Sequence, residues 1–302
     1  MQSGKILGIN QHSLTVPVAI AVAIIISSIM IIMPGTSTEL SSFFSNWTVN
    51  ISILAATLFS GISTLKSYWT YKLLVKSKSK TLNEGIQSDL LFAKRQFYTF
   101  FSLTIGLVLW TLAEFTWTYF QLILGIENPF PSEADAFWLL GYPFIILFTY
   151  GVNKILSKNG VYDRETLILL SVSAGLTLGY IFNLTFGIAD ILATSEDQIG
   201  WLIGIFYPIL DTIALVPSLL IVILLRNNIS NSNLHWSLFA GSIIILTIAD
   251  IGFGYSELLG TAEEEQWFWD ILYTSSYIFM AGALYAYFKI QHVRSIHAQA
   301  PT

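Results

Sequence analysis

Cysteine is absent from this 302-residue chain, and charged residues are scarce at 11%. Without a thiolate the chain can form no disulfide, no Cys-ligated zinc site and no iron–sulfur cluster. Soluble domains carry about 25% charged residues, whereas 54% of this chain is hydrophobic and its mean hydropathy is +0.65. So much apolar surface requires lipid, so we expect an integral membrane protein whose first partner is the lipid bilayer.

Several catalytic and cofactor signatures are missing as well. The chain has only four histidines, His12, His235, His292 and His297, and all are expected at the cytoplasmic side, so we expect no haem held by paired histidines inside the membrane. No P-loop, G-x-S-x-G or H-E-x-x-H motif occurs. No lysine lies deep in the last two apolar runs, which removes an attachment point for retinal. We therefore expect no cofactor and no nucleic-acid partner, and the sequence leaves any metal unidentified.

Runs of about 20 apolar residues, enough to cross a hydrocarbon core of about 30 Å, recur along the chain. They predict an all-α integral membrane protein with about eight transmembrane helices. The first run is too long for the core of a signal peptide, so we expect a retained helix. The predicted helices are Thr15–Met33, Ile51–Tyr71, Phe97–Leu124, Ala136–Leu156, Glu165–Ile188, Gln198–Leu225, Leu234–Leu259 and Phe268–Ile290.

All fourteen Lys and Arg residues fall on one side of an eight-helix arrangement. Cytoplasmic loops near helix ends accumulate such residues, so we expect a multi-pass protein of the cell membrane with the N-terminus and C-terminus cytoplasmic. The other side is acidic, either to attract cations or only because basic residues are excluded there. The predicted divisions are two N-terminal helices over 1–72, a basic cytoplasmic loop over 73–96, a six-helix repeat region over 97–290 (97–156, 165–225 and 234–290) and a short cytoplasmic tail over 291–302.

A helical hairpin is repeated within the chain. Thr111-Leu112-Ala113-Glu114 is followed by Tyr119, Asp135 and Tyr142, and Thr247-Ile248-Ala249-Asp250 is followed by Tyr255, Asp270 and Tyr277 at nearly the same separations. The segment from Trp201 to Pro208 echoes the segment from Trp138 to Pro143, which indicates a weaker third copy. Each hairpin begins and ends on the same side, so these are repeated parallel hairpins and not the inverted repeats of many transporters.

Three acids, Glu114, Asp211 and Asp250, lie well inside predicted membrane helices. A charge near the bilayer centre costs about 2.5–3.5 kcal/mol on insertion scales, so such residues face the bundle interior and have partners or a function. One interpretation is an outward-facing polar cavity that binds a small ligand or cation. The alternative is a hydrogen-bonded clamp that only fixes the hairpins. The candidate binding residues are Glu114, Tyr119, Asp135, Tyr142, Tyr207, Asp211, Asp250, Tyr255, Asp270 and Tyr277.

Asp135 and Asp270 have a second interpretation. Each stands near the predicted start of a helix, where an aspartate can cap free backbone N–H groups. The sequence therefore leaves open whether these two residues surround the mouth of the cavity or only cap their helices.

The segment from Pro131 to Pro143, PSEADAFWLLGYP, resembles a pattern in multi-helix membrane sensor regions of prokaryotes. Tyr207-Pro208-x-x-Asp211 and Asp250-x-x-x-x-Tyr255 are similar to that pattern too, so the likeness covers roughly 97–290. Such regions typically precede GGDEF diguanylate cyclase or histidine kinase domains, which implies signalling. This chain ends about a dozen residues after its last predicted helix, so we expect the output domain to belong to a separate partner protein.

These observations favour a membrane sensor or interaction module. The alternatives are a cation- or proton-coupled transporter that uses the three acids, and an accessory subunit of a larger membrane complex. We expect no enzyme. An intramembrane aspartyl hydrolase would use Asp211 and Asp250, yet the Gly-x-Gly-Asp and Pro-Ala-Leu elements of that family are not matched here.

Overall fold

The computed structural model describes residues 11–33, 38–78, 84–126, 129–156, 198–226 and 233–299, together with 168, 171–172, 175–176 and 178–179. Over these residues the chain is helical and contains no strand. The predicted fifth helix, Glu165–Ile188, lies almost wholly outside the described residues. The described helices are α1 (Gln11–Ile32), α2 (Thr38–Lys78), α3 (Glu84–Thr118), the π-helical turn η1 (Tyr119–Ile123), α4 (Glu133–Leu156), α6 (Gln198–Leu225), α7 (Leu234–Leu259) and α8 (Ala262–Gln299).

Seven of these helices are long and apolar enough to cross a membrane, which confirms the all-α, multi-pass character of the chain. Their outer faces carry large exposed apolar side chains, as on α1, where Val18, Ile25 and Ile29 are each more than half exposed. A water-soluble bundle would bury such residues, so lipid is the environment that suits this surface.

Helices α6 and α7 have the predicted bounds, but α2, α3 and α8 extend well beyond theirs. Most of the segment 73–96, predicted as a loop, is helical, because α2 continues to Lys78 and α3 begins at Glu84. Hydropathy marks only the part of a helix that crosses lipid. α2 contains no proline, and its last turns are rich in Lys and Leu, which are good helix formers in water as well.

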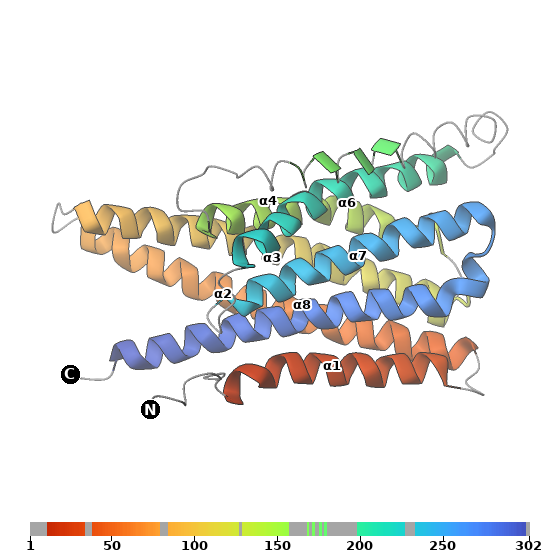
Figure 1. Cartoon of the computed structure of the whole chain (residues 1–302), viewed down its shortest axis with the longest axis horizontal. Helices are drawn as coiled ribbons and strands as arrows, with labels where there is room; N and C mark the ends of the chain where they lie inside the picture. The colour runs from red at the N-terminus through yellow and green to blue at the C-terminus, as the bar shows by residue number, and fades with distance from the viewer. Residues whose placement is uncertain are drawn as a thin grey trace, which may run out of the picture.

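Six helices form a closed ring in the order α2, α3, α4, α6, α7 and α8, and each contacts the next, with α8 returning to α2. α1 packs outside the ring against α8 and α2. In Figure 1 the helices run along the long axis of the molecule, and α1 begins at the same end at which α8 finishes. We call this the terminal end, and the opposite one the loop end.

The ring divides into two sets of three helices, α2–α3–α4 and α6–α7–α8, here called the first and second halves. A two-fold rotation about the bundle axis would exchange α3 with α7, α4 with α8 and α2 with α6, and it would preserve every neighbouring contact in the ring. The two halves are thus parallel repeats. The third copy predicted over 165–225 can be followed only at α6, which takes the place opposite α2.

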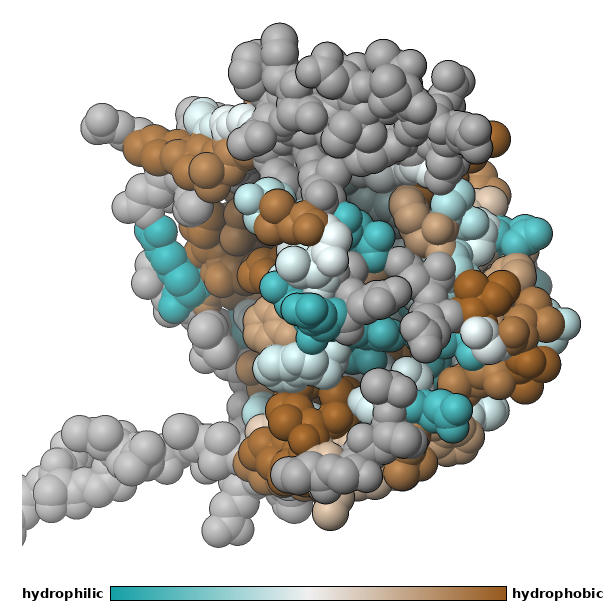
Figure 2. All heavy atoms as spheres, turned by 90° about the vertical axis from the view of Figure 1, so that its right-hand side faces the viewer, coloured by the Kyte–Doolittle hydropathy of each residue, from teal (hydrophilic) through white to brown (hydrophobic). Residues whose placement is uncertain are grey.

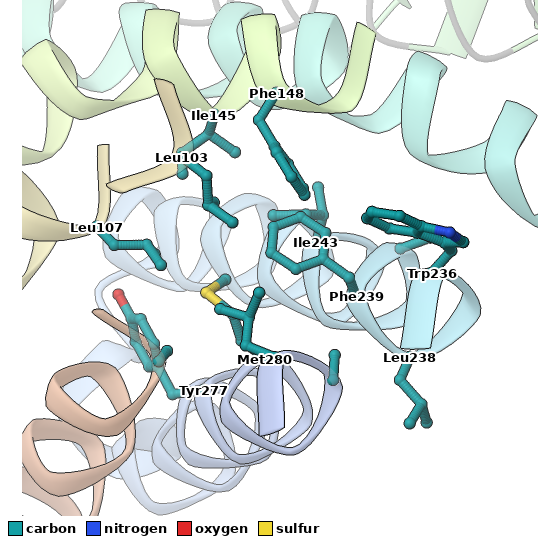
Figure 3. Close-up of a cluster of buried hydrophobic side chains, with 14 of the residues drawn as sticks. Leu103, Leu107, Ile145, Phe148, Trp236, Leu238, Phe239, Ile243, Tyr277 and Met280 are labelled. Carbon is teal, nitrogen blue, oxygen red and sulfur yellow. The ribbon is translucent and has the colours of Figure 1, made fainter. Parts of the chain in front are cut away.

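Large apolar side chains fill the ring toward the terminal end. Figure 3 shows residues of α3, α4, α7 and α8 meeting there, among them Leu103, Phe148, Phe239 and Met280. Phe148 packs edge-on against Phe239, with ring centroids 4.7 Å apart. This dry core joins the two halves. The three membrane acids lie beyond it, toward the loop end.

Candidate functional site

The structure brings the three membrane acids together with tyrosines in the loop-end half of the ring. Glu114 comes from α3, Asp211 from α6 and Asp250 from α7. Glu114 is 8% exposed and Asp211 only 1%, whereas Asp250 is partly exposed. In the view onto the loop end, Figure 2 shows hydrophilic residues near the middle of the face with apolar ones around them.

Glu114 accepts hydrogen bonds from both halves. The indole N–H of Trp138, on α4 of its own hairpin, donates to Oε1 over 3.1 Å. The hydroxyl of Tyr277, on α8 of the other half, donates to the same oxygen. Both donors thus use one carboxylate oxygen, and the bond from Tyr277 ties the second half to the first.

Asp250 repeats this arrangement with the halves exchanged. Tyr273, on α8 of its own hairpin, donates to Oδ1 over 2.8 Å. The hydroxyl of Tyr142, on α4 of the other half, lies 3.0 Å from Oδ2. Tyr142 and Tyr277 correspond in the sequence repeat, and so do Trp138 and Tyr273. The repeated sequence therefore forms two reciprocal bridges across the interface between the halves.

Asp211 joins only the second of these centres. The Tyr142 hydroxyl lies 2.6 Å from its Oδ1 and so contacts the carboxyl groups of Asp211 and Asp250 together. The carboxyl groups of Asp211 and Asp250 also lie beside each other, and Oδ2 of Asp211 is buried with no N–H or hydroxyl donor among the described residues. Tyr142 is held from the side by Trp110, which packs edge-on at 5.4 Å and donates its N–H to the carbonyl of Trp138.

Asp135 lies at the start of α4 and has two roles. Its Oδ2 accepts the backbone N–H of Ser132 over 2.7 Å, while the Ser132 hydroxyl accepts the N–H of Ala134, which caps the helix. Its Oδ1 accepts the hydroxyl of Tyr207 over 2.7 Å. Tyr207 stands one turn before Asp211 on α6, and its ring packs edge-on against Tyr142 at 6.2 Å. Asp135 is thus linked to the central group through Tyr207.

Asp270 does not cap a helix, and this interpretation of it was wrong. α8 begins at Ala262, so Asp270 lies more than two turns inside the helix. It accepts a hydrogen bond from Ser45 of α2, as Asp135 accepts one from Tyr207 of α6. The two-fold rotation that exchanges the halves relates these two contacts. Each contact attaches the last helix of one half to the first helix of the other.

Two predicted residues stay outside this group, and two unpredicted ones belong to it. Tyr119 and Tyr255 are 52% and 53% exposed and face away from the carboxyl groups. Trp138 and Tyr273, which donate to Glu114 and Asp250, were missed. They are the corresponding residues of the repeat, 135 positions apart, and that match was the signal available in the sequence.

The group contains no basic residue that would balance its acids. Among the described residues, Lys and Arg lie toward the terminal end, as Lys66, Arg95, Lys154 and Arg226 illustrate. Within the same described part of the chain, no three His, Cys, Asp or Glu side chains are arranged to hold a metal ion. The arrangement can therefore hold protons or a small cation among its carboxyl and hydroxyl groups, but it lacks the donors of a typical divalent metal centre.

Comparison with known proteins adds no assignment to this geometry. No family model, no curated protein and no solved structure matches the chain.

Proposed function

We propose that this chain is a membrane sensor or interaction module. The two halves of the ring respond to the charge on the carboxyl groups of Glu114 and Asp250, which join them. The reciprocal bridges carry the proposal: Tyr142 of the first half contacts Asp250, and Tyr277 of the second half donates to Glu114. A change of charge at either acid alters a bond that crosses between halves, so it alters their packing. Two-state packing of this kind is how a local event produces a distant response.

The terminal end provides a surface on which such a response can act. α2 has 41 residues and α3 has 35, which gives lengths of about 60 Å and about 50 Å against a hydrocarbon core of about 30 Å. Arg95 of α3 donates to the carbonyl of Lys154 near the end of α4, so the part of α3 before Arg95 projects past α4, as Figure 1 shows at the terminal end.

This projection combines apolar and basic residues. Trp69, Leu73, Leu91 and Phe92 are each more than half exposed, with Lys72, Lys76 and Lys94 nearby in the sequence. The basic residues support a cytoplasmic position for the terminal end, with both termini there, in the cell membrane. The exposed apolar side chains suit a separate signalling partner. The likeness of 97–290 to prokaryotic sensor regions supports the same assignment.

The absence of cysteine permits a direct test. Leu73→Cys on α2 and Leu224→Cys on α6 place one spin label on each half, at exposed positions near the terminal end. We expect the distance between the labels to change when pH or the cation present is varied. In the Tyr142→Phe background the distance should no longer respond, because one of the bridges between the halves is gone.

A matched control uses Leu73→Cys with Leu91→Cys, since both residues belong to the first half. Their separation should stay constant while the separation between halves changes. A distance between halves that is the same under every condition would refute the sensor proposal.

Cation- or proton-coupled transport is the second candidate, and a specific observation favours it. Asp250, Tyr207 and Tyr273 belong to the acid centre of the second half yet are partly exposed, which favours access of a proton or cation to this carboxyl group. In proteoliposomes, coupled flux that disappears on replacing Glu114, Asp211 and Asp250 with their amides would establish transport. Flux that survives all three replacements would remove this candidate.

A further inference from the structure

Two polar groups close to the Asp250 centre differ from their counterparts in the first half of the ring. Thr111 and Thr247 correspond in the repeat. The hydroxyl of Thr111 is hydrogen-bonded to Thr57 of α2 at 2.8 Å. The hydroxyl of Thr247 is buried, with the residue 2% exposed, and has no partner among the described residues.

The helices α2 and α6 also differ at the depth of the membrane acids. Ser45 of α2 and Tyr207 of α6 correspond, because they donate to Asp270 and Asp135 respectively. Four residues later α2 carries the buried Val49, but α6 carries Asp211, whose carboxyl group lies beside that of Asp250. Its Oδ2 receives no N–H or hydroxyl donor from the described residues. Thr247 lies one turn before Asp250 on the same face of α7. The face of α7 that carries Asp250 therefore also carries a buried hydroxyl without a partner among the described residues.

Asp211 and Asp250 also have too few hydrogen-bond protons between them. Tyr142 has one hydroxyl proton, yet its oxygen lies 2.6 Å from Asp211 Oδ1 and 3.0 Å from Asp250 Oδ2. With both acids ionised, one of these contacts would set a phenol lone pair against a carboxylate. Buried charges without a partner strongly disfavour the folded state. One additional positive charge, placed between the two acids, removes the conflict.

We propose that Asp211 and Asp250, with Tyr142 and Thr247, form a binding site for one monovalent cation taken from solution, a proton or Na⁺. The proposal rests on the proposed function, because it names the species to which the two halves respond. Two carboxyl groups suit a single charge better than a divalent metal, which prefers more oxygen ligands and more negative charge. Tyr207 and Asp135 lead from this site toward the loop end, where the cation enters.

Two measurements on the purified chain in detergent distinguish the two cations. In Na⁺-free buffer, infrared spectroscopy records the carbonyl stretch of protonated carboxyl groups. If the site holds a proton, this band is present in the wild type, is lost in Asp211→Asn and in Asp250→Asn, and is retained in Glu114→Gln. The Glu114 variant is a matched control, because it removes the corresponding acid of the first half.

If the site holds Na⁺, added NaCl raises the melting temperature of the wild type while KCl of the same ionic strength does not. Both Asn variants lose this shift. Thr247→Val removes a hydroxyl that has no hydrogen-bond partner among the described residues, so the fold should be retained, and the variant should weaken Na⁺ binding about tenfold.

The proposal is overturned if the wild type shows neither the band nor the shift, or if either signal persists in both Asn variants. Its failure differs from that of the proposed function. If a cation binds here but the distance between the labels on the two halves does not change, the binding site is confirmed and the sensor function is refuted.

Discussion

Glu114 and Asp250 occupy corresponding positions in two hairpins, and each interacts with an aromatic side chain of its own hairpin and with a tyrosine of the other. The centres differ in what surrounds this common frame. Glu114 is buried and has two donors for itself, whereas Asp250 is partly exposed and shares the Tyr142 hydroxyl with Asp211. The carboxyl group of Glu114 thus has two hydrogen-bond donors of its own. The carboxyl groups of Asp211 and Asp250 together have more acceptor oxygen atoms than donors.

The difference originates in the flanking helices. α2 is rich in small polar residues whose hydroxyl and amide groups bond α3, as in the contacts of Asn50 with Thr118 and of Ser60 with Thr104. α6 is more apolar, and it provides Asp211 where α2 has Val49. Duplication of a helical frame thus gives one acid centre in which Glu114 has two donors of its own, and one in which two carboxyl groups share the Tyr142 hydroxyl, where a ligand is most useful.

The largest expected effect comes from comparing the two bridging tyrosines. Tyr142→Phe leaves Asp211 buried with no described donor and takes one contact from Asp250, so we expect it to destabilise the folded state by about 3 kcal/mol. Tyr277→Phe leaves Glu114 with the N–H of Trp138, so its cost should be about 1 kcal/mol. Reversible unfolding in mixed micelles of mild detergent and SDS measures both values. Equal costs would show that the two centres are equivalent and would remove the asymmetry.

Each hairpin has a glycine packed closely against a tryptophan, and the two tryptophans differ in burial. A Cβ atom at Gly141 of α4 would lie 2.3 Å from the Trp110 ring, and one at Gly252 of α7 would lie 2.2 Å from the Trp269 ring. Both indole N–H groups are hydrogen-bonded, but Trp110 is 1% exposed whereas Trp269 is partly exposed and has more room to shift. We expect Gly141→Ala to destabilise the chain by about 2 kcal/mol and Gly252→Ala by less.

Gly204→Ala on α6 is the control for these substitutions, because a Cβ there meets nothing within 4 Å. Alanine favours a helix over glycine, so this variant should be at least as stable as the wild type. Unfolding in the same mixed micelles ranks the three variants. If Gly252→Ala proved the most damaging, the second half would be the more rigid one.

Much of the fold could be predicted, because lipid imposes a length and a composition on each membrane helix. α6 and α7 have the predicted bounds, since apolar runs end there in polar segments. The projections of α2 and α3 could not be found by this criterion, because a helix continues into water wherever propensity permits. The expected loop over 73–96 was wrong for that reason.

The candidate site was predictable to the extent that the repeat determines it. Glu114, Asp250, Tyr142 and Tyr277 were found because the same residues recur at the same spacing, and these residues do meet. That Tyr142 would contact the acid of the other hairpin depends on how the halves pack, which no local spacing indicates. Asp211 joins only the centre around Asp250, because α6 lies between α4 and α7 in the ring.

The smallest effect is expected at the two tyrosines that follow the acids by five residues. Five residues turn an α-helix by about 500°, so Tyr119 and Tyr255 lie about 140° around the helix from Glu114 and Asp250, and both are more than half exposed. Tyr119→Phe and Tyr255→Phe should each change stability by less than about 0.5 kcal/mol and leave the carboxyl band and the Na⁺ response as in the wild type. Should Tyr255→Phe alone impair cation binding, the path to the second centre would pass along the outer face of α7, and Tyr207 with Asp135 would not be the entrance.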